Sequence, residues 1–135
     1  MKLKLTISLM AVLLSGCQSM TQAPVTPLQL SADEVRLLLE DRTVESFNLI
    51  TGTTSFTYYA TDGSVYQERY WSQRTGTWNI KPDGQICMSM MSKAGSCRYI
   101  FQAGKKYYKY RTDADGNLEK IIRYRQFLEG NMLAK

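Results

Sequence analysis

Cations and tyrosines alternate in the segment Lys105–Arg111. Side chains two residues apart in an extended strand lie on the same face. One face of this segment would therefore hold Lys105, Tyr107, Lys109 and Arg111. Such a face could bind a phosphate or an acidic sugar, with tyrosine as a flat stacking surface. The same pattern is typical of an edge strand whose lysines discourage aggregation, and we favour that interpretation. A second, less charged group has the same two interpretations and consists of Tyr66, Arg69, Tyr70 and Trp71.

The sequence contains no histidine. This excludes Ser-His-Asp and Cys-His catalysis and the common zinc sites. A hydrolase built on paired carboxylates remains as a minor alternative, although most acidic residues fall in an expected helix or in expected turns. The run Asp113–Glu119 spaces oxygen atoms as calcium loops do, but its glycine and glutamate positions differ from those of an EF-hand and favour a hairpin turn. We therefore predict that the protein is not an enzyme and uses no metal and no cofactor.

The N-terminus has the order of residues of an export signal. Two lysines precede the apolar run Leu5–Leu14, which at about ten residues is half the length that crosses a bilayer as a helix. The stretch Leu14-Ser15-Gly16-Cys17 resembles the lipobox of bacterial lipoproteins. This resemblance implies a signal peptide over residues 1–16, cleavage before Cys17 and a lipid on its thiol. Because Gln18 is not aspartate, it also implies the periplasmic side of the outer membrane of a Gram-negative bacterium. The alternative is an ordinary cleaved signal with a coincidental cysteine.

Export also determines what we expect of the other cysteines and of the charge. Lipidation would use Cys17 and leave Cys87 and Cys97 as a pair in an oxidising compartment, so we predict a disulfide between them. Loss of Lys2 and Lys4 with the signal would lower the formal net charge from +5 to +3. This mild positive charge suits anionic lipid headgroups, lipopolysaccharide or acidic glycans, but it is too small to indicate a nucleic-acid partner.

A single helix is expected near the start of the mature chain. Ser31 and Glu34 have the spacing of a capping box, and Leu30 and Val35 have the spacing of a hydrophobic staple. Apolar residues then recur at helical spacing, and we expect the helix to end near residues 41–42.

After this helix the composition changes to β-branched and aromatic residues, with glycine-containing turns at intervals. The expected strands are Val44–Ile50, Ser55–Ala60, Ser64–Ser72, Thr77–Ile80, Gln85–Met91, Cys97–Phe101, Lys105–Arg111 and Asn117–Tyr124. Because tight turns join consecutive strands, the order predicts an antiparallel meander. The predicted fold class is α+β, with the helix packed on a strongly curved antiparallel sheet or a small β-barrel.

The expected domain boundaries follow from these elements. Residues 17–27 are polar and contain two prolines, which indicates a flexible linker from the lipidated cysteine. Residues 28–129 would form a single globular domain, and residues 130–135 would form a tail. The pattern does not decide whether the stretch Gln126–Lys135 contains a short helix or is a frayed end.

Alternation along the strands predicts which side chains are inside. Three groups are core candidates: Ile86 with Met88 and Met90; Trp78 with Ile80; and Cys97 with Tyr99 and Phe101. Cys87 would then face away from its neighbours Ile86 and Met88. A disulfide from Cys87 to an inward-facing Cys97 would require a bulge or a local twist.

The order of several short motifs resembles a family of small exported proteobacterial domains, the domain of unknown function numbered 995. The resemblance covers roughly residues 28–110 and rests on Leu30-Ser31-Ala32-Asp33-Glu34-Val35, Tyr58-Tyr59-Ala60-Thr61-Asp62-Gly63, Gly76-Thr77-Trp78-Asn79-Ile80, Asp83-Gly84-Gln85-Ile86-Cys87 and Cys97. It implies a capped helix, a strand that ends in Asp-Gly, a Gly-x-Trp strand and a cysteine pair, and it implies no particular activity. The Gly76-x-Trp78 element is also similar to the lipocalin signature, but it falls in the middle of the chain and the likeness is local.

These expectations together favour a lipid-anchored accessory or binding protein of the cell envelope. Its partners would be the membrane, through the N-terminal lipid, and either another envelope protein or an anionic glycan. The alternative is a periplasmic inhibitor of a cell-wall-degrading enzyme such as lysozyme. That alternative is weakened because lysozymes are usually basic and would be repelled by a basic inhibitor.

Overall fold

The computed structural model describes residue 16 and residues 23–134. Most of the expected signal peptide, Cys17 and the first part of the expected linker therefore lie outside the described residues. The helix and strands are β1 (Leu28–Gln29), α1 (Ala32–Leu39), β2 (Arg42–Asn48), β3 (Thr54–Tyr59), β4 (Ser64–Arg69), β5 (Ser72–Ile80), β6 (Ile86–Met90), β7 (Ser96–Ala103), β8 (Lys106–Thr112) and β9 (Leu118–Glu129). No helix among the described residues has both the length and the apolar character needed to span a membrane.

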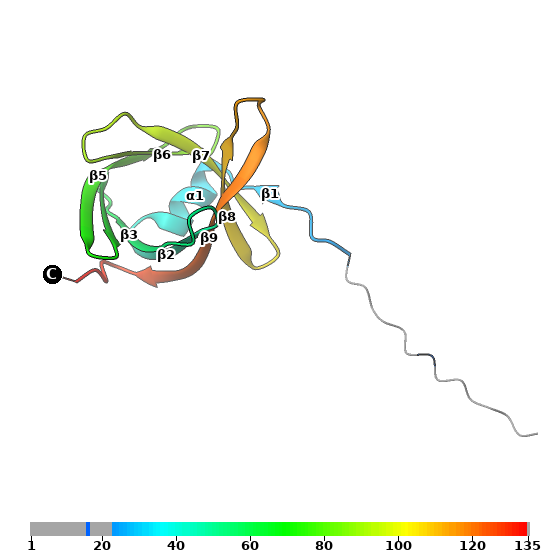
Figure 1. Ribbon diagram of the computed structural model, residues 1–135, viewed down its shortest axis with the longest axis horizontal. Helices are drawn as coiled ribbons and strands as arrows, with labels where there is room; N and C mark the ends of the chain where they lie inside the picture. The colour runs from blue at the N-terminus through cyan, green and yellow to red at the C-terminus, as the bar shows by residue number, and fades with distance from the viewer. Residues whose placement is uncertain (1–15, 17–22, 135) are drawn as a thin grey trace, which may run out of the picture.

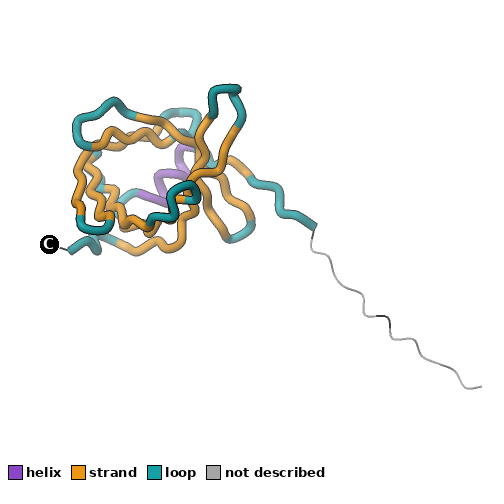
Figure 2. Tube along the Cα trace, viewed as in Figure 1, coloured by secondary structure: helices purple, strands orange, loops and turns teal. Residues whose placement is uncertain are grey.

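Strands β2 to β9 close into an antiparallel barrel. Each pairs with the next along the chain, and β9 returns to pair with β2. The short strand β1 lies outside this ring and pairs with β7. Figures 1 and 2 show the ring of strands with α1 inside its outline. The expected barrel is confirmed, but the α+β class gave the helix too much weight, because the chain is mostly β and α1 has eight residues.

The meander gives the barrel two different ends. The connections β3–β4, β5–β6 and β7–β8 lie at the end covered by α1, which we call the closed end. The connections β2–β3, β4–β5, β6–β7 and β8–β9 lie at the other end, which we call the open end. Every second connection is at the same end because consecutive strands are antiparallel.

The helix begins as its sequence predicts. Glu34 N donates to Ser31 Oγ at 3.3 Å, and Ser31 N donates to Glu34 Oε2 at 3.2 Å, so the capping box is formed. Leu30 and Val35 are both buried, as expected of a hydrophobic staple. The helix ends at Leu39, two residues earlier than expected, because the chain must turn there to enter β2.

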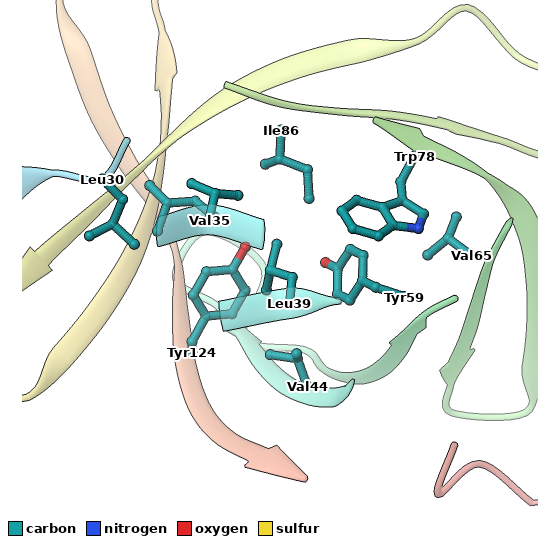
Figure 3. Close-up of a cluster of buried hydrophobic side chains, with 10 residues drawn as sticks. Leu30, Val35, Leu39, Val44, Tyr59, Val65, Trp78, Ile86 and Tyr124 are labelled. Carbon is teal, nitrogen blue, oxygen red and sulfur yellow. The ribbon is translucent and has the colours of Figure 1, made fainter. Parts of the chain in front are cut away.

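The core fills the closed end of the barrel. Val35 and Leu39 of α1 meet side chains from the surrounding strands, including Tyr59 and Trp78 (Figure 3). The two rings pack edge to face with centroids 5.3 Å apart, and Trp78 Nε1 donates to Ala60 O at 2.8 Å. Full burial of a large apolar side chain contributes about 1.5–3 kcal/mol. The helix thus acts as the floor of the barrel.

The expected inner face of β7 is wrong. Ile100 is fully buried in the core, so alternation places Cys97, Tyr99 and Phe101 on the outside. Phe101 packs against Tyr110 on that outer face, with ring centroids 4.7 Å apart. The outer face of β7 carries Tyr99 and Phe101, whereas Ile100 on the inner face lies between polar residues, so alternation pointed to the wrong face.

The predicted disulfide between Cys87 and Cys97 is present. The two cysteines lie directly opposite each other on β6 and β7, in a ladder with no register shift. Of the bulge or local twist expected here, the bulge is absent from this ladder, because Cys97 faces outward together with Cys87. Closing a loop of this size stabilises a fold by about 2–3 kcal/mol on the chain-entropy model.

Two strand boundaries also differ from the expectation. The segment expected as one strand, Ser64–Ser72, is divided by a tight turn at Tyr70-Trp71, and β5 starts at Ser72 instead of Thr77. Strand β9 continues to Glu129, so its last residues form neither a helix nor a frayed end. The following chain crosses the outside of β2, where Thr43 Oγ1 donates to Gly130 O at 2.7 Å and accepts from Met132 N at 2.9 Å.

Candidate ligand-binding site at the open end of the barrel

A cavity of about 300 Å³ opens between the strands at the open end of the barrel. It is lined by Asn48, Thr53, Ser55, Gln67, Arg69, Arg74, Met88, Met90, Lys93, Ala94, Ser96, Lys109 and Ile122. The inward positions of the strands change character along the barrel, from apolar beside α1 to polar and cationic at the open end. The cavity is therefore polar where it opens to solvent and has the apolar core of the barrel as its floor.

Four cations from separate segments line this cavity. Arg69 comes from β4 and Arg74 from β5, Lys93 from the β6–β7 loop, and Lys109 from β8. None of the described residues that line the cavity is acidic. Charges of one sign within low-dielectric walls focus the electrostatic field. The open end is thus suited to attract an anion.

Lys109 contacts side chains at the apolar floor of the cavity. Its Nζ is 3.7 Å from Met88 Sδ and 5.8 Å from the centroid of the Tyr124 ring. Burial lowers the pKa of Lys109 to about 8, and the positive charge of Arg98 acts in the same direction. No ion pair joins Lys109 to a carboxylate within the part of the chain that the structure describes. Among the described residues, its ammonium group is in contact with a thioether and an aromatic ring.

Arg74 is held in place by a chain of side-chain hydrogen bonds. Its Nη1 donates to Gln67 Oε1 at 3.3 Å, and Gln67 Nε2 donates to Thr57 Oγ1 at 3.0 Å. Thr57 is buried in the barrel wall. The guanidinium is thereby oriented in advance, and a guanidinium can bind a carboxylate or phosphate with two parallel hydrogen bonds.

Below the cations, the floor carries two buried phenols that stay neutral. Burial raises the pKa values of Tyr59 and Tyr124. The hydroxyl of Tyr59 donates to Met88 Sδ at 3.8 Å. The floor therefore supplies no negative charge that would neutralise Lys109.

The structure separates most of the residues predicted to form one ligand face. Lys105 is exposed in the β7–β8 turn at the closed end, and Tyr107 packs inward against Phe127 with centroids 5.5 Å apart. Arg111 pairs with Glu119 at 2.8 Å. Of this group, Lys109 lines the cavity. The preferred interpretation of the segment as a protective edge strand is wrong, because β8 lies between β7 and β9.

The second predicted face is placed at the open end. Tyr70 and Trp71 are strongly exposed at the tip of the β4–β5 turn, directly after Arg69. Arg74 and Lys93 were not expected to take part. The sequence held a signal for Arg74, because it lies four residues before the core residue Trp78 and a continuous strand would place both on the same face. Using this signal required knowing that β5 starts at Ser72.

A larger groove of about 560 Å³ lies at the closed end, between β1, α1 and β8. Its lining is mixed in charge, with Glu34 and Arg42 as well as the exposed Leu28 and Leu37. The groove has no excess of one charge, so it is the weaker candidate for binding the anionic partners expected from the sequence.

Comparison with known proteins identifies no matching family profile, curated protein or solved structure.

Proposed function

We propose that this chain is a lipid-anchored, non-catalytic protein of the cell envelope that binds an anionic ligand in the cavity at the open end of its barrel. The observation that carries the proposal is the convergence of Arg69, Arg74, Lys93 and Lys109 on one cavity with no acidic residue in the described lining. The lipobox-like segment that ends at Cys17 supports the anchoring.

The energetics of Lys109 favour binding over a purely structural role. A buried charge without a charged partner destabilises a fold. A hydrogen bond to a charged group contributes about 1.5–3 kcal/mol, so an incoming carboxylate or phosphate would offset part of the cost. A methionine could fill the same space at lower cost. The presence of lysine therefore supports a function for the charge.

The size and lining of the cavity indicate the part of a ligand that it can hold. A volume of about 300 Å³ is at the lower end of the range for small-molecule sites. Ser55, Ser96 and Asn48 supply neutral polar groups beside the cations. We infer that the site takes one acidic unit of an envelope glycan. An acidic side chain of another envelope protein is the second class of ligand that fits the same chemistry.

A lysozyme inhibitor is less consistent with this site. A cationic cavity would repel a basic enzyme and slow its association. The positive charge of the cavity is thus a further reason, beside the net positive charge of the sequence, to prefer an anionic ligand over lysozyme.

The test uses the full chain purified from membranes and two supports, peptidoglycan and immobilised lipid-free core oligosaccharide of lipopolysaccharide. We expect retention at low salt that falls as salt increases, because added salt screens the cations. Lys109→Gln and Arg74→Gln should each reduce retention by about tenfold, which corresponds to about 1.4 kcal/mol.

The matched control is the double variant Lys105→Gln with Lys106→Gln, which removes two exposed positive charges at the closed end. It should retain the ligand almost as well as the unchanged chain. Equal losses in the control and cavity variants would contradict a site at the open end. Absence of retention on both supports at low salt would contradict glycan binding.

A further inference from the structure

Three connections surround the cavity at the open end: the β2–β3 loop, the β4–β5 turn and the β6–β7 loop. Each places large apolar side chains in solvent. The exposed side chains, with their exposed fractions, are Leu49 (42%), Ile50 (54%), Tyr70 (73%), Trp71 (101%) and Met91 (53%). Scattered exposed apolar residues are ordinary, but five of them in the connections at one end of the barrel indicate an interaction surface. We call these five residues the apolar rim.

The backbone supports this interpretation of the apolar rim. Tyr70 and Met91 both have positive φ angles, 52° and 55°. Residues with large side chains adopt this left-handed conformation at a cost, and glycine or asparagine would adopt it more easily. Strained conformations of this kind persist where the surrounding structure holds them and are concentrated at functional sites.

Cations predominate in and beside the connections that carry the apolar rim, with Glu68 as the acidic residue near the β4–β5 turn. The connections that carry the rim contain Lys93 and no acidic residue, and the cavity inside them is cationic. The fourth connection at this end carries Asp113 and Asp115, but its hairpin projects away from the ring of strands (Figure 1). Asp113 Oδ1 accepts from the backbone N of Asp115 at 2.9 Å and from that of Asn117 at 2.8 Å, so this carboxylate is engaged within its own turn.

We propose that the open end of the barrel docks onto a lipid surface that carries anionic headgroups. In the docked state a headgroup phosphate takes the place of the acidic glycan unit in the cavity and pairs with the cations, while the apolar rim enters the interface between headgroups and acyl chains. Tryptophan and tyrosine favour this interface because their rings are amphipathic. Interfacial binding combines apolar insertion with electrostatic attraction, which is the combination that the rim and the cavity present.

This inference rests on the proposed anchoring through Cys17, because the anchor keeps the domain beside a membrane. The six to nine residues of strands such as β4 and β5 make the barrel roughly 20–30 Å high. The eleven residues 17–27, fully extended, reach about 36 Å. The tether is long enough for the open end to turn toward the membrane that holds it.

The experiment uses the full chain, carrying its own lipid, reconstituted in two kinds of vesicle. One kind contains phosphatidylcholine alone, and the other contains phosphatidylcholine with phosphatidylglycerol; both include lipids with brominated acyl chains, which quench tryptophan fluorescence. Trp71 is the reporter because it is fully exposed, whereas Trp78 is buried and gives a constant background. Docking predicts strong quenching in the phosphatidylglycerol vesicles and weak quenching in the others.

Variants separate docking from simple tethering. Loss of one cation near an anionic surface lowers the equilibrium constant for docking roughly fivefold, so Arg69→Gln and Lys93→Gln should each reduce the quenching. Ile50→Ser should also reduce it through the apolar rim. The double variant Lys105→Gln with Lys106→Gln, at the closed end, should leave it unchanged.

Equal quenching in both kinds of vesicle, or none in either, would overturn lipid docking. Flotation of the same vesicles tests the anchor separately, because a chain without the lipid on Cys17 would not stay with them. One combination of results would contradict lipid docking and leave glycan binding intact. In it, the chain floats with both kinds of vesicle, iodide quenches Trp71 in both, and the lipid-free oligosaccharide still binds.

Discussion

Lys109 and Met88 face each other inside the barrel, with the ammonium nitrogen 3.7 Å from the thioether sulfur. A thioether is a weak hydrogen-bond acceptor and carries no charge. The pair therefore leaves the lysine charge uncompensated at the base of a cavity whose other charged lining residues are also cations.

Lys109→Met is expected to stabilise the protein while it weakens ligand binding. Below about pH 8 the folded protein holds a charged Lys109 that burial disfavours. Removing that charge should raise the free energy of unfolding by roughly 1–3 kcal/mol, since one pKa unit corresponds to about 1.4 kcal/mol. Denaturant unfolding of the variant and the unchanged chain at neutral pH measures the difference. A variant less stable than the unchanged chain would show that the amine is a structural contact.

The same group predicts a pH dependence of stability. The pKa of Lys109 is lowered to about 8 in the folded protein from 10.5 when free, so between these values the unfolded chain binds more protons. The free energy of unfolding contributed by this group must then rise with pH across that window. Tyr59 and Tyr124 have raised pKa values and act in the opposite direction only near and above pH 10. The free energy of unfolding should therefore rise between about pH 7.5 and 9.5 in the unchanged chain and should not rise in Lys109→Met. The same rise in the variant would show that another group causes the pH dependence.

Gly84→Ala should destabilise the closed end of the barrel. Gly84 has a φ of 91°, and a Cβ at this position would collide with the carbonyl oxygen of Leu30, just before the helix cap. Gly116 is the matched control, because its φ is 82° and no atom lies within 4 Å of an added Cβ. The left-handed conformation alone costs about 1–2 kcal/mol, so Gly84→Ala should lower the free energy of unfolding by clearly more than Gly116→Ala does. Equal losses would mean that the loop at Gly84 moves freely.

Cys17 should carry the lipid of the mature protein. Intact-mass analysis of membrane-purified material is expected to show a chain that begins at residue 17 with acyl groups attached, and Cys17→Ser should leave the precursor uncut. Two or more acyl chains anchor a protein firmly, whereas one holds it marginally. An unmodified N-terminus in the purified protein would refute the anchoring.

Local signals made much of the fold predictable. The capping box at Ser31 and Glu34 depends on neighbouring residues, and so do the turns at Asp62-Gly63 and Asp115-Gly116. Their physical causes are complete within a few residues, so the sequence indicates them directly. The closure of the barrel followed because a long antiparallel meander otherwise leaves free edges.

Other features depended on contacts distant in the sequence. The turn at Tyr70-Trp71 contains no glycine, proline or asparagine, and Tyr70 adopts a positive φ without the residue types that signal one. The inner face of β7 was predicted wrongly because the apolar alternation of this strand lies on its outer face, around Tyr99 and Phe101. The cavity is lined by the ends of strands far apart in the sequence. That Arg74 and Lys109 line the same cavity therefore could not be predicted without the strand register.

The most direct test of the central claim, that the open-end cavity binds an anion, is the rate at which the Lys109 amine is acylated. At about pH 8 a substantial fraction of Lys109 is uncharged and reactive, and mass spectrometry of peptides separates it from Lys105 and Lys106. We expect lipid-free core oligosaccharide of lipopolysaccharide to slow acylation of Lys109 by about tenfold, as occupancy near 90% requires, and to leave acylation of the two closed-end lysines unchanged. Equal rates at Lys109 with and without the saturating oligosaccharide would contradict the claim.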